Sequence, residues 1–144
     1  MVSKSALHKS FVLESSVAAT ERLCERLLAE AAANKFDGDD IFAIHLALEE
    51  AFINAVRHGN KQDEAKTVAV ECLITPDKLD ILIADEGAGF NPDSVPDPRS
   101  EENIYKPAGR GLLLMRSFMD VVEHNETGNC VHMVKYKSKP KNES

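Results

Sequence analysis

The chain has 144 residues, of which 17 are Lys or Arg and 24 are Asp or Glu, so its formal net charge is -7. That length predicts one domain with a full hydrophobic core, and the negative charge argues against direct binding to nucleic acid or to an anionic membrane. Three cysteines without C-x-x-C spacing indicate neither a disulfide framework nor a zinc site, and no run approaches the roughly 18 apolar residues of a membrane span. We therefore expect a cytoplasmic protein whose partners are proteins or small molecules.

The first half of the chain predicts one strand and two helices. A short run over 7–13 mixes apolar and polar residues and predicts a strand, and the two serines after it are suitable helix caps. Apolar residues recur at helical spacing over 17–33, which predicts an amphipathic helix. Residues 36–40 supply a glycine and aspartates for a turn, and the second helix then runs to its end at Gly59 and the asparagine that follows.

A polar ridge runs along the second helix, between two apolar stripes. Glu50, Asn54 and His58 follow one another at i, i+4 and therefore stack along one line of the helix. The apolar stripes on either side predict that the helix is covered twice. They are Ile41, Ile44, Leu48, Phe52, Ala55 and Val56 on one side, and Phe42, Leu46 and Ile53 on the other. Taken alone, the ridge fits a solvated helix face with a capping histidine equally well.

The second half of the chain predicts two hairpins. Alternation over 67–74 and again from Leu79 predicts the first hairpin, and the core-facing row of its return strand ends in the carboxylate of Asp85. An acid turned inward is costly unless a group pairs with it, and a bound ligand is a reasonable partner. Residues 121–124 and 130–137 predict the second hairpin.

The stretch between the hairpins predicts a binding loop and a short helix. Residues 87–108 are rich in proline and acidic side chains and show no periodicity, and a loop of this length in a compact domain is usually a lid or a binding loop. The sequence Gly109-Arg110-Gly111 then closes this lid and precedes a helix over 112–119. The first backbone N–H groups of such a helix are free to bind an anion.

The order of these elements predicts the architecture of the domain. We expect an α/β sandwich of the α+β type, in which helices cover one face of a mixed β-sheet. The domain occupies residues 1–138, and the polar tail over 139–144 is expected to be disordered.

Three short motifs lie in order along this chain. They are Glu50-x-x-x-Asn54 on a helix, Asp85-x-Gly87-x-Gly89 after a strand, and Gly109-x-Gly111 before a helix. Each is weak alone, because glycine pairs are common in turns. Together they resemble the three nucleotide-binding boxes of the ATPases that share the Bergerat fold of gyrase, Hsp90 and histidine kinases. The small size and the forms of residues 49–59 and 109–115 resemble, within that superfamily, the bacterial anti-sigma factor serine kinases.

The resemblance implies a role for each residue of the first two motifs. Asn54 would hold Mg²⁺ against the phosphates of ATP, a task suited to an amide oxygen, and Glu50 would be the general base for an incoming serine hydroxyl. Asp85 would recognise the adenine amino group. Gly87 and Gly89 would let the backbone approach the base and the ribose.

The third motif would govern the phosphates. Its two glycines would let the lid close so that helix N–H groups meet the phosphates, and Arg110 or Lys106 would either contact the phosphates or remain a solvated charge. His58 matches a family histidine and is interpreted as a structural cap. The chain departs from some family kinases by carrying Pro107-Ala108 where they have an arginine, and this departure bears on phosphoryl transfer more than on ATP binding.

The resemblance implies a regulatory kinase that depends on ATP and Mg²⁺ and works by partner switching. It would bind a sigma factor or another protein target, and phosphorylate a serine on an antagonist of the anti-anti-sigma type, where the added charge would repel the complex. The family often dimerises, so a homodimer is expected. Two alternatives stay open, namely a non-catalytic nucleotide-sensing module that binds a partner, and a plain interaction domain with a vestigial pocket.

Overall fold

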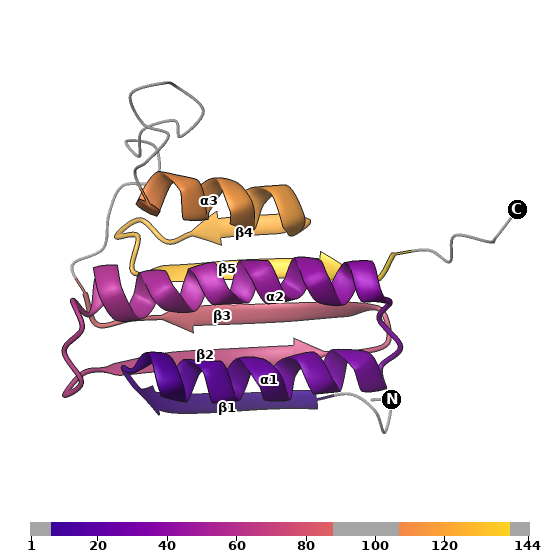
Figure 1. The fold of residues 1–144 in the computed structure, drawn as a ribbon, viewed down its shortest axis with the longest axis horizontal. Helices are drawn as coiled ribbons and strands as arrows, with labels where there is room; N and C mark the ends of the chain where they lie inside the picture. Colours follow the sequence, from indigo (N-terminus) through magenta and orange to yellow (C-terminus); the bar gives the residue numbers. More distant parts are fainter. Residues whose placement is uncertain (1–6, 88–106, 139–144) are drawn as a thin grey trace, which may run out of the picture.

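The computed structural model describes residues 7–87 and 107–138, with side chains in the second range from Gly111 onward. Figure 1 shows its strands and helices in chain order. They are β1 (Leu7–Glu14), α1 (Val17–Ala33), α2 (Gly38–Ile53), the π-helical segment η1 (Asn54–Gly59), β2 (Thr67–Ile74), β3 (Lys78–Ala84), α3 (Pro107–Phe118), β4 (Val121–His124) and β5 (Cys130–Tyr136). The predictions for Gly89, Lys106, most of the lid and the tail lie outside the described residues.

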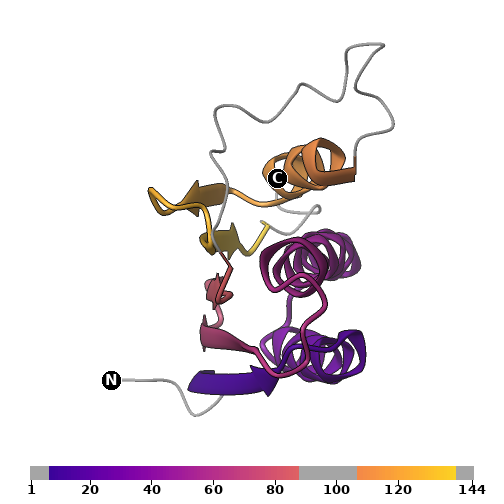
Figure 2. The same cartoon turned by 90° about the vertical axis from the view of Figure 1, so that its left-hand side faces the viewer.

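The strands form one five-stranded sheet in the order β1-β2-β3-β5-β4. The helices lie on one face of this sheet, as Figure 2 shows from the side, so the predicted α+β sandwich is confirmed. The prediction of a mixed sheet is wrong, because each of the four neighbouring strand pairs is antiparallel. The connection through α3 brings β4 back in the direction of β3, but β5 lies between these two strands and pairs with both.

The helix α2 lies between α1 and α3 on this face (Figure 1). Both flanks of α2 are therefore packed, which confirms that the helix is covered on more than one side. On the α3 side, the rings of Phe42 and Phe118 meet edge to face with their centroids 6.1 Å apart, a favourable aromatic geometry. The start of α1 is capped as expected, since Oγ of Ser16 accepts a hydrogen bond from the N–H of Ala19 at 3.2 Å.

The helix α3 begins at Pro107, five residues before the predicted start at residue 112. Proline suits the first helical position, because its fixed φ is already helical and its missing N–H would have no partner there. Gly109 and Gly111 therefore lie inside α3 rather than ahead of it, and the lid ends before Pro107. Within residues 7–87 and 107–138, no helix combines the length and the apolar character needed to cross a membrane.

The core lies between the helices and the inward rows of the sheet. Alternate residues of the two central strands, β2 and β3, face the helices and are buried. They are Val68, Val70, Cys72, Ile74, Leu79, Ile81 and Ile83. The row between them faces away from the helices, so that Ile81 is 0% exposed and its neighbour Leu82 is 37% exposed.

This one-sided burial predicts opposite outcomes for two adjacent residues. Ile81→Ala removes a fully buried side chain and should lower the free energy of unfolding by about 2–5 kcal/mol. The matched control, Leu82→Ala on the outer face of the same strand, should cost less than about 1 kcal/mol. Urea unfolding of both variants measures this difference. Equal losses would mean that the outer face of the sheet is also covered.

Candidate functional site

The first and third motifs meet where α3 approaches the end of α2. Glu50 lies in the last turn of α2, and Asn54 follows as the first residue of η1. A Cβ atom built at Gly111 would lie 2.6 Å from Oε2 of Glu50 and 3.5 Å from Nδ2 of Asn54. The lack of a side chain at residue 111 is therefore what lets α3 lie this close to the polar ridge.

The second motif meets the other end of the same helical segment. A Cβ atom at Gly59 would lie 2.2–2.4 Å from the carboxylate atoms of Asp85, and one at Gly87 would lie 2.1 Å from the carbonyl oxygen of Gly59. Neither position has room for any other residue without displacement. The N–H of Gly87 donates to Oδ1 of Asp85 at 2.7 Å, so the loop after β3 turns its carboxylate onto the end of η1.

Asp85 is half-buried, as its place at the end of an inward-facing row predicts. Burial is the largest influence on its side chain and raises the pKa of the carboxyl, while the N–H of Gly87 and the charge of Lys66 act in the opposite direction. A partly desolvated carboxylate of this kind is stabilised when a hydrogen-bond donor replaces the water that it has lost. The carboxylate is thus suited to accept a hydrogen bond from a ligand.

The segment from Glu50 to Gly59 separates these two places. The nine steps from Glu50 to Gly59, at 1.5 Å each, give a spacing of about 13 Å, somewhat less because part of the segment is π-helical. A carboxylate and an amide lie at one end, and a second carboxylate lies at the other. This arrangement suits an elongated ligand that is recognised at one end and reacts at the other.

The segment that carries His58 is not a regular α-helix. Residues 54–59 are π-helical, which places more residues in each turn than the regular spacing assumes. His58 is exposed, and the N–H of Asn60, rather than an imidazole, closes the segment by donating to the carbonyl of Ala55 at 2.8 Å. π-Helical turns of this kind are frequent at functional sites.

Asn60 also supports the site, although its place in the sequence indicates only the end of a helix. It is fully buried. Its Nδ2 donates to Oγ of Ser15 at 3.0 Å and to the carbonyl of Thr67 at 2.9 Å, while its Oδ1 accepts from the N–H of Glu86 at 2.7 Å. One side chain thus ties the start of α1, the start of β2 and the Asp85 loop together. No spacing rule distinguishes such a residue from an ordinary turn asparagine.

The first turn of α3 contains the remaining predicted residues. Gly109 and Arg110 belong to this turn, whose backbone N–H groups have no partner within the helix and can face an anion. The position of the Arg110 side chain lies outside the described part of the chain. Among residues 7–87 and 107–138, no three His, Cys, Asp or Glu side chains are arranged as metal ligands.

Comparisons with known proteins agree with this arrangement. The family described as "Histidine kinase-like ATPase domain" matches residues 13–135. Serine-protein kinase RsbW of Bacillus subtilis is 33% identical over 108 residues, which cover 68% of this chain and 66% of that protein. Anti-sigma F factor of Oceanobacillus iheyensis is 32% identical over 110 residues, which cover 72% of this chain and 74% of that protein. The chain thus spans just under two thirds of the first relative's length.

A solved structure supports the fold. The RsbU and RsbW domains of a Mycobacterium tuberculosis protein superpose with a TM-score of 0.62 and 17% sequence identity. The match covers 93% of this chain and 33% of that chain. At this level of identity the likeness concerns the arrangement of strands and helices.

The buried hydrogen bonds of Asn60 generate a stability prediction. Asn60→Ala removes three hydrogen bonds made by a fully buried side chain and should lower the free energy of unfolding by about 1–3 kcal/mol or more. The control is Asn125→Ala in the exposed β4–β5 turn, where Oδ1 of Asn125 accepts from the N–H groups of Gly128 and Cys130 but water can replace it. Chemical denaturation of both variants gives the comparison. A smaller loss at Asn60 than at Asn125 would contradict its place as a buried junction.

Proposed function

Since the chain belongs to the histidine kinase-like ATPase domain family, we propose that it binds ATP with Mg²⁺ and transfers the γ-phosphoryl group to a serine of a partner protein. The observation that carries this proposal is the position of Gly111 against Glu50 and Asn54, which brings the start of α3 to the polar ridge. Phosphoryl transfer relies on positioning and on charge neutralisation, and this junction offers both.

In this proposal the Asp85 end of the site binds the base. The carboxylate of Asp85 accepts a hydrogen bond from the adenine amino group, a polar contact that suits a half-buried acid with a raised pKa. Gly59 and Gly87 keep side chains out of the space that Asp85 occupies. The hydrogen bonds of Asn60 to Ser15, Thr67 and Glu86 hold the loop in that position.

The Glu50 end performs the transfer. Asn54 would hold Mg²⁺ through its amide oxygen, and the ion would supply neutralisation of the phosphate charge. The serine oxygen forms a bond to the γ-phosphorus as the bond from that phosphorus to the β–γ bridging oxygen breaks, and Glu50 takes the hydroxyl proton. The free N–H groups in the first turn of α3 face the phosphates. Pro107 begins this helix, so the positive charge would come from Arg110 or Lys106 rather than from an arginine in its place.

The names of the relatives indicate which partner proteins to propose for this chain. Relatives named serine-protein kinase and anti-sigma F factor support two protein partners for this chain, a sigma factor and an antagonist of the anti-anti-sigma type. Binding the first would keep it inactive, and phosphorylating the second would stop the antagonist from displacing it. We place this cycle in the cytoplasm, with the chain as a homodimer.

Nucleotide binding is tested by calorimetric titration with ATP, with and without Mg²⁺. Asn54→Ala should abolish the effect of Mg²⁺, and Asp85→Asn should weaken ATP binding by roughly 10- to 100-fold, because a charge-assisted hydrogen bond is lost. The control is Asp77→Asn in the exposed β2–β3 turn, which should bind as the unaltered chain does. Unchanged affinity in Asp85→Asn would exclude this carboxylate as the adenine contact.

Transfer is tested with γ-labelled ATP and a cognate anti-anti-sigma-type protein. Glu50→Gln should keep Mg-ATP binding yet slow labelling of the partner serine by roughly 10²–10⁴-fold, the usual contribution of a general base. Glu14→Gln, an exposed change at the end of β1, serves as the control. Normal labelling by Glu50→Gln would remove the proposed base. ATP binding without labelling by the unaltered chain would instead identify a nucleotide-sensing module.

A further inference from the structure

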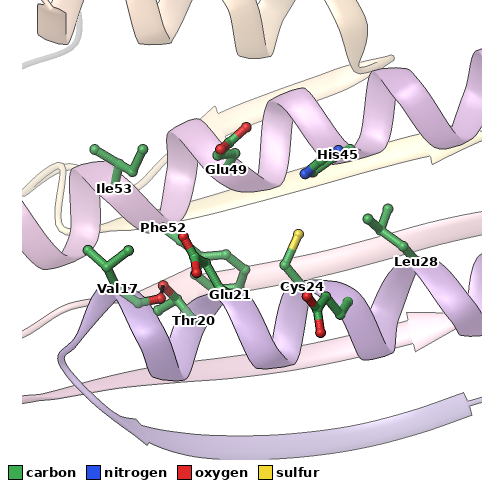
Figure 3. A pocket seen from close by; sticks show the side chains of 10 residues that line it. Val17, Thr20, Glu21, Cys24, Leu28, His45, Glu49, Phe52 and Ile53 are labelled. Carbon is green, nitrogen blue, oxygen red and sulfur yellow. Dashed lines mark hydrogen bonds between the residues drawn. The ribbon is translucent and has the colours of Figure 1, made fainter.

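A groove runs between α1 and α2, with a volume of about 240 Å³. Figure 3 shows the side chains of both helices that line it. Its floor consists of the buried residues Thr20, Cys24 and Phe52, and half-buried Val17, Leu28 and Ile53 form its walls. The groove therefore has an apolar interior that remains partly exposed in the described part of the chain.

The rim of the groove is acidic. Four exposed residues, Glu21, Glu25, His45 and Glu49, stand along it, and neither a lysine nor an arginine belongs to the lining. The arginines of α1 lie on another side of that helix, where the guanidinium of Arg26 stacks over the ring of Phe11 in β1 at 5.2 Å. Glu21 and Glu25 of α1 therefore face the groove, whereas Arg26 faces β1.

The negative potential reaches the floor of the groove. The pKa of the Cys24 thiol is raised to about 11, chiefly by burial and in addition by the charges of Glu49, Glu25 and Glu21. These three carboxylates belong to two different helices and act on one point between them. An occupant that places a positive charge above this floor would be attracted by all three carboxylates.

The dimensions of the groove suit a helix. The lining of α1 extends from Val17 to Leu28, and the eleven steps between these residues, at 1.5 Å each, give a length of about 16 Å, or three helical turns. Its volume lies below the roughly 300–1,000 Å³ of ordinary small-molecule pockets. A third helix laid along two packed helices can insert apolar side chains between them and extend Lys or Arg stems toward the rim.

We propose that the α1–α2 groove is a docking site for a basic amphipathic helix of a partner protein. The partner inserts leucine or isoleucine side chains at i, i+3 and i+4 over Cys24 and Phe52, and its flanking lysines or arginines pair with Glu21, Glu25 and Glu49. The inference goes beyond the proposed kinase activity. It requires no nucleotide, because Glu50 and Asn54 meet α3, whereas the groove lies on the α1 side of α2.

Two synthetic peptides of about three to four helical turns provide the probes. Both carry the same leucine face, and their polar faces carry lysines in one and glutamates in the other. Fluorescence anisotropy without nucleotide should show binding of the basic peptide that weakens with added salt, and little binding of the acidic peptide. Backbone amide NMR shifts on titration should concentrate in residues 17–28 and 45–53. Shifts confined to the strands would overturn the proposal.

A charge reversal supplies the decisive comparison. Glu21→Lys/Glu25→Lys should weaken the basic peptide roughly tenfold, because two ion pairs are replaced by repulsion, and should create binding of the acidic peptide. The control Glu64→Lys/Glu126→Lys changes the net charge equally at exposed positions outside the groove and should alter neither affinity. Lysine has a helix propensity similar to that of glutamate, so α1 should remain folded, which circular dichroism checks.

Three outcomes would refute the docking site. Equal weakening by the control variant would show that only the overall charge of the chain matters. Failure of the acidic peptide to bind Glu21→Lys/Glu25→Lys would show that the rim does not select the occupant. Loss of self-association in the same variant, measured by light scattering, together with no binding of the basic peptide to the unaltered chain, would assign the groove to a second copy of this chain.

Discussion

The contact between Gly59 and Asp85 is the constraint on which the rest of the site depends. The carboxylate of Asp85 occupies the space that a side chain at residue 59 would need, and Gly87 lies just as close to the backbone of Gly59. This contact joins the end of a helix to the end of a strand, and the hydrogen bond from the N–H of Glu86 to Asn60 joins the same two places. Because the helix also carries Glu50 and Asn54, the position of Asp85 relative to both is set by the length of one helical segment.

The two ends of the site are supported in different ways. At the Asp85 end, Asn60 holds the loop through hydrogen bonds to Ser15, Thr67 and Glu86, and the carbonyl of Asn129 accepts from the N–H of Asp85 at 2.9 Å. These partners belong to the borders of the sheet. At the Glu50 end, the approach of α3 depends on the small size of residue 111, and that helix begins only at Pro107. The Asp85 end is therefore built into the fold, whereas the Glu50 end depends on how α3 is placed.

Spacing patterns in the sequence predicted those features of the structure that depend on residues close together in the chain. The bounds of α1 and β2, the serine cap and the inward row ending in Asp85 follow from helical and alternating spacing and agree with the structure. The antiparallel pairing of β3 with β5 could not be predicted, because it depends on which of two later strands takes the neighbouring place. Nor could the π-helical turn, which no spacing pattern marks, or the hydrogen bonds of Asn60 to Ser15 and Glu86, which lie 45 and 26 residues away in the sequence.

Two adjacent residues of α2 face the α1–α2 groove and the α3 side of the helix. Glu49 and Glu50 are separated by about 100° around the helix, so Glu49 stands on the rim of the groove beside α1 while Glu50 meets Gly111 of α3. A helix docked in the groove and a nucleotide at the Glu50 end would therefore contact the same turn, directly before the π-helical segment. If such a segment has two arrangements, and each of the two ligands binds one arrangement more tightly than the other, then binding of one ligand changes the affinity for the other. The π-helical segment η1 begins directly after this turn and ends at Gly59 against Asp85, so it connects the two ends of the site.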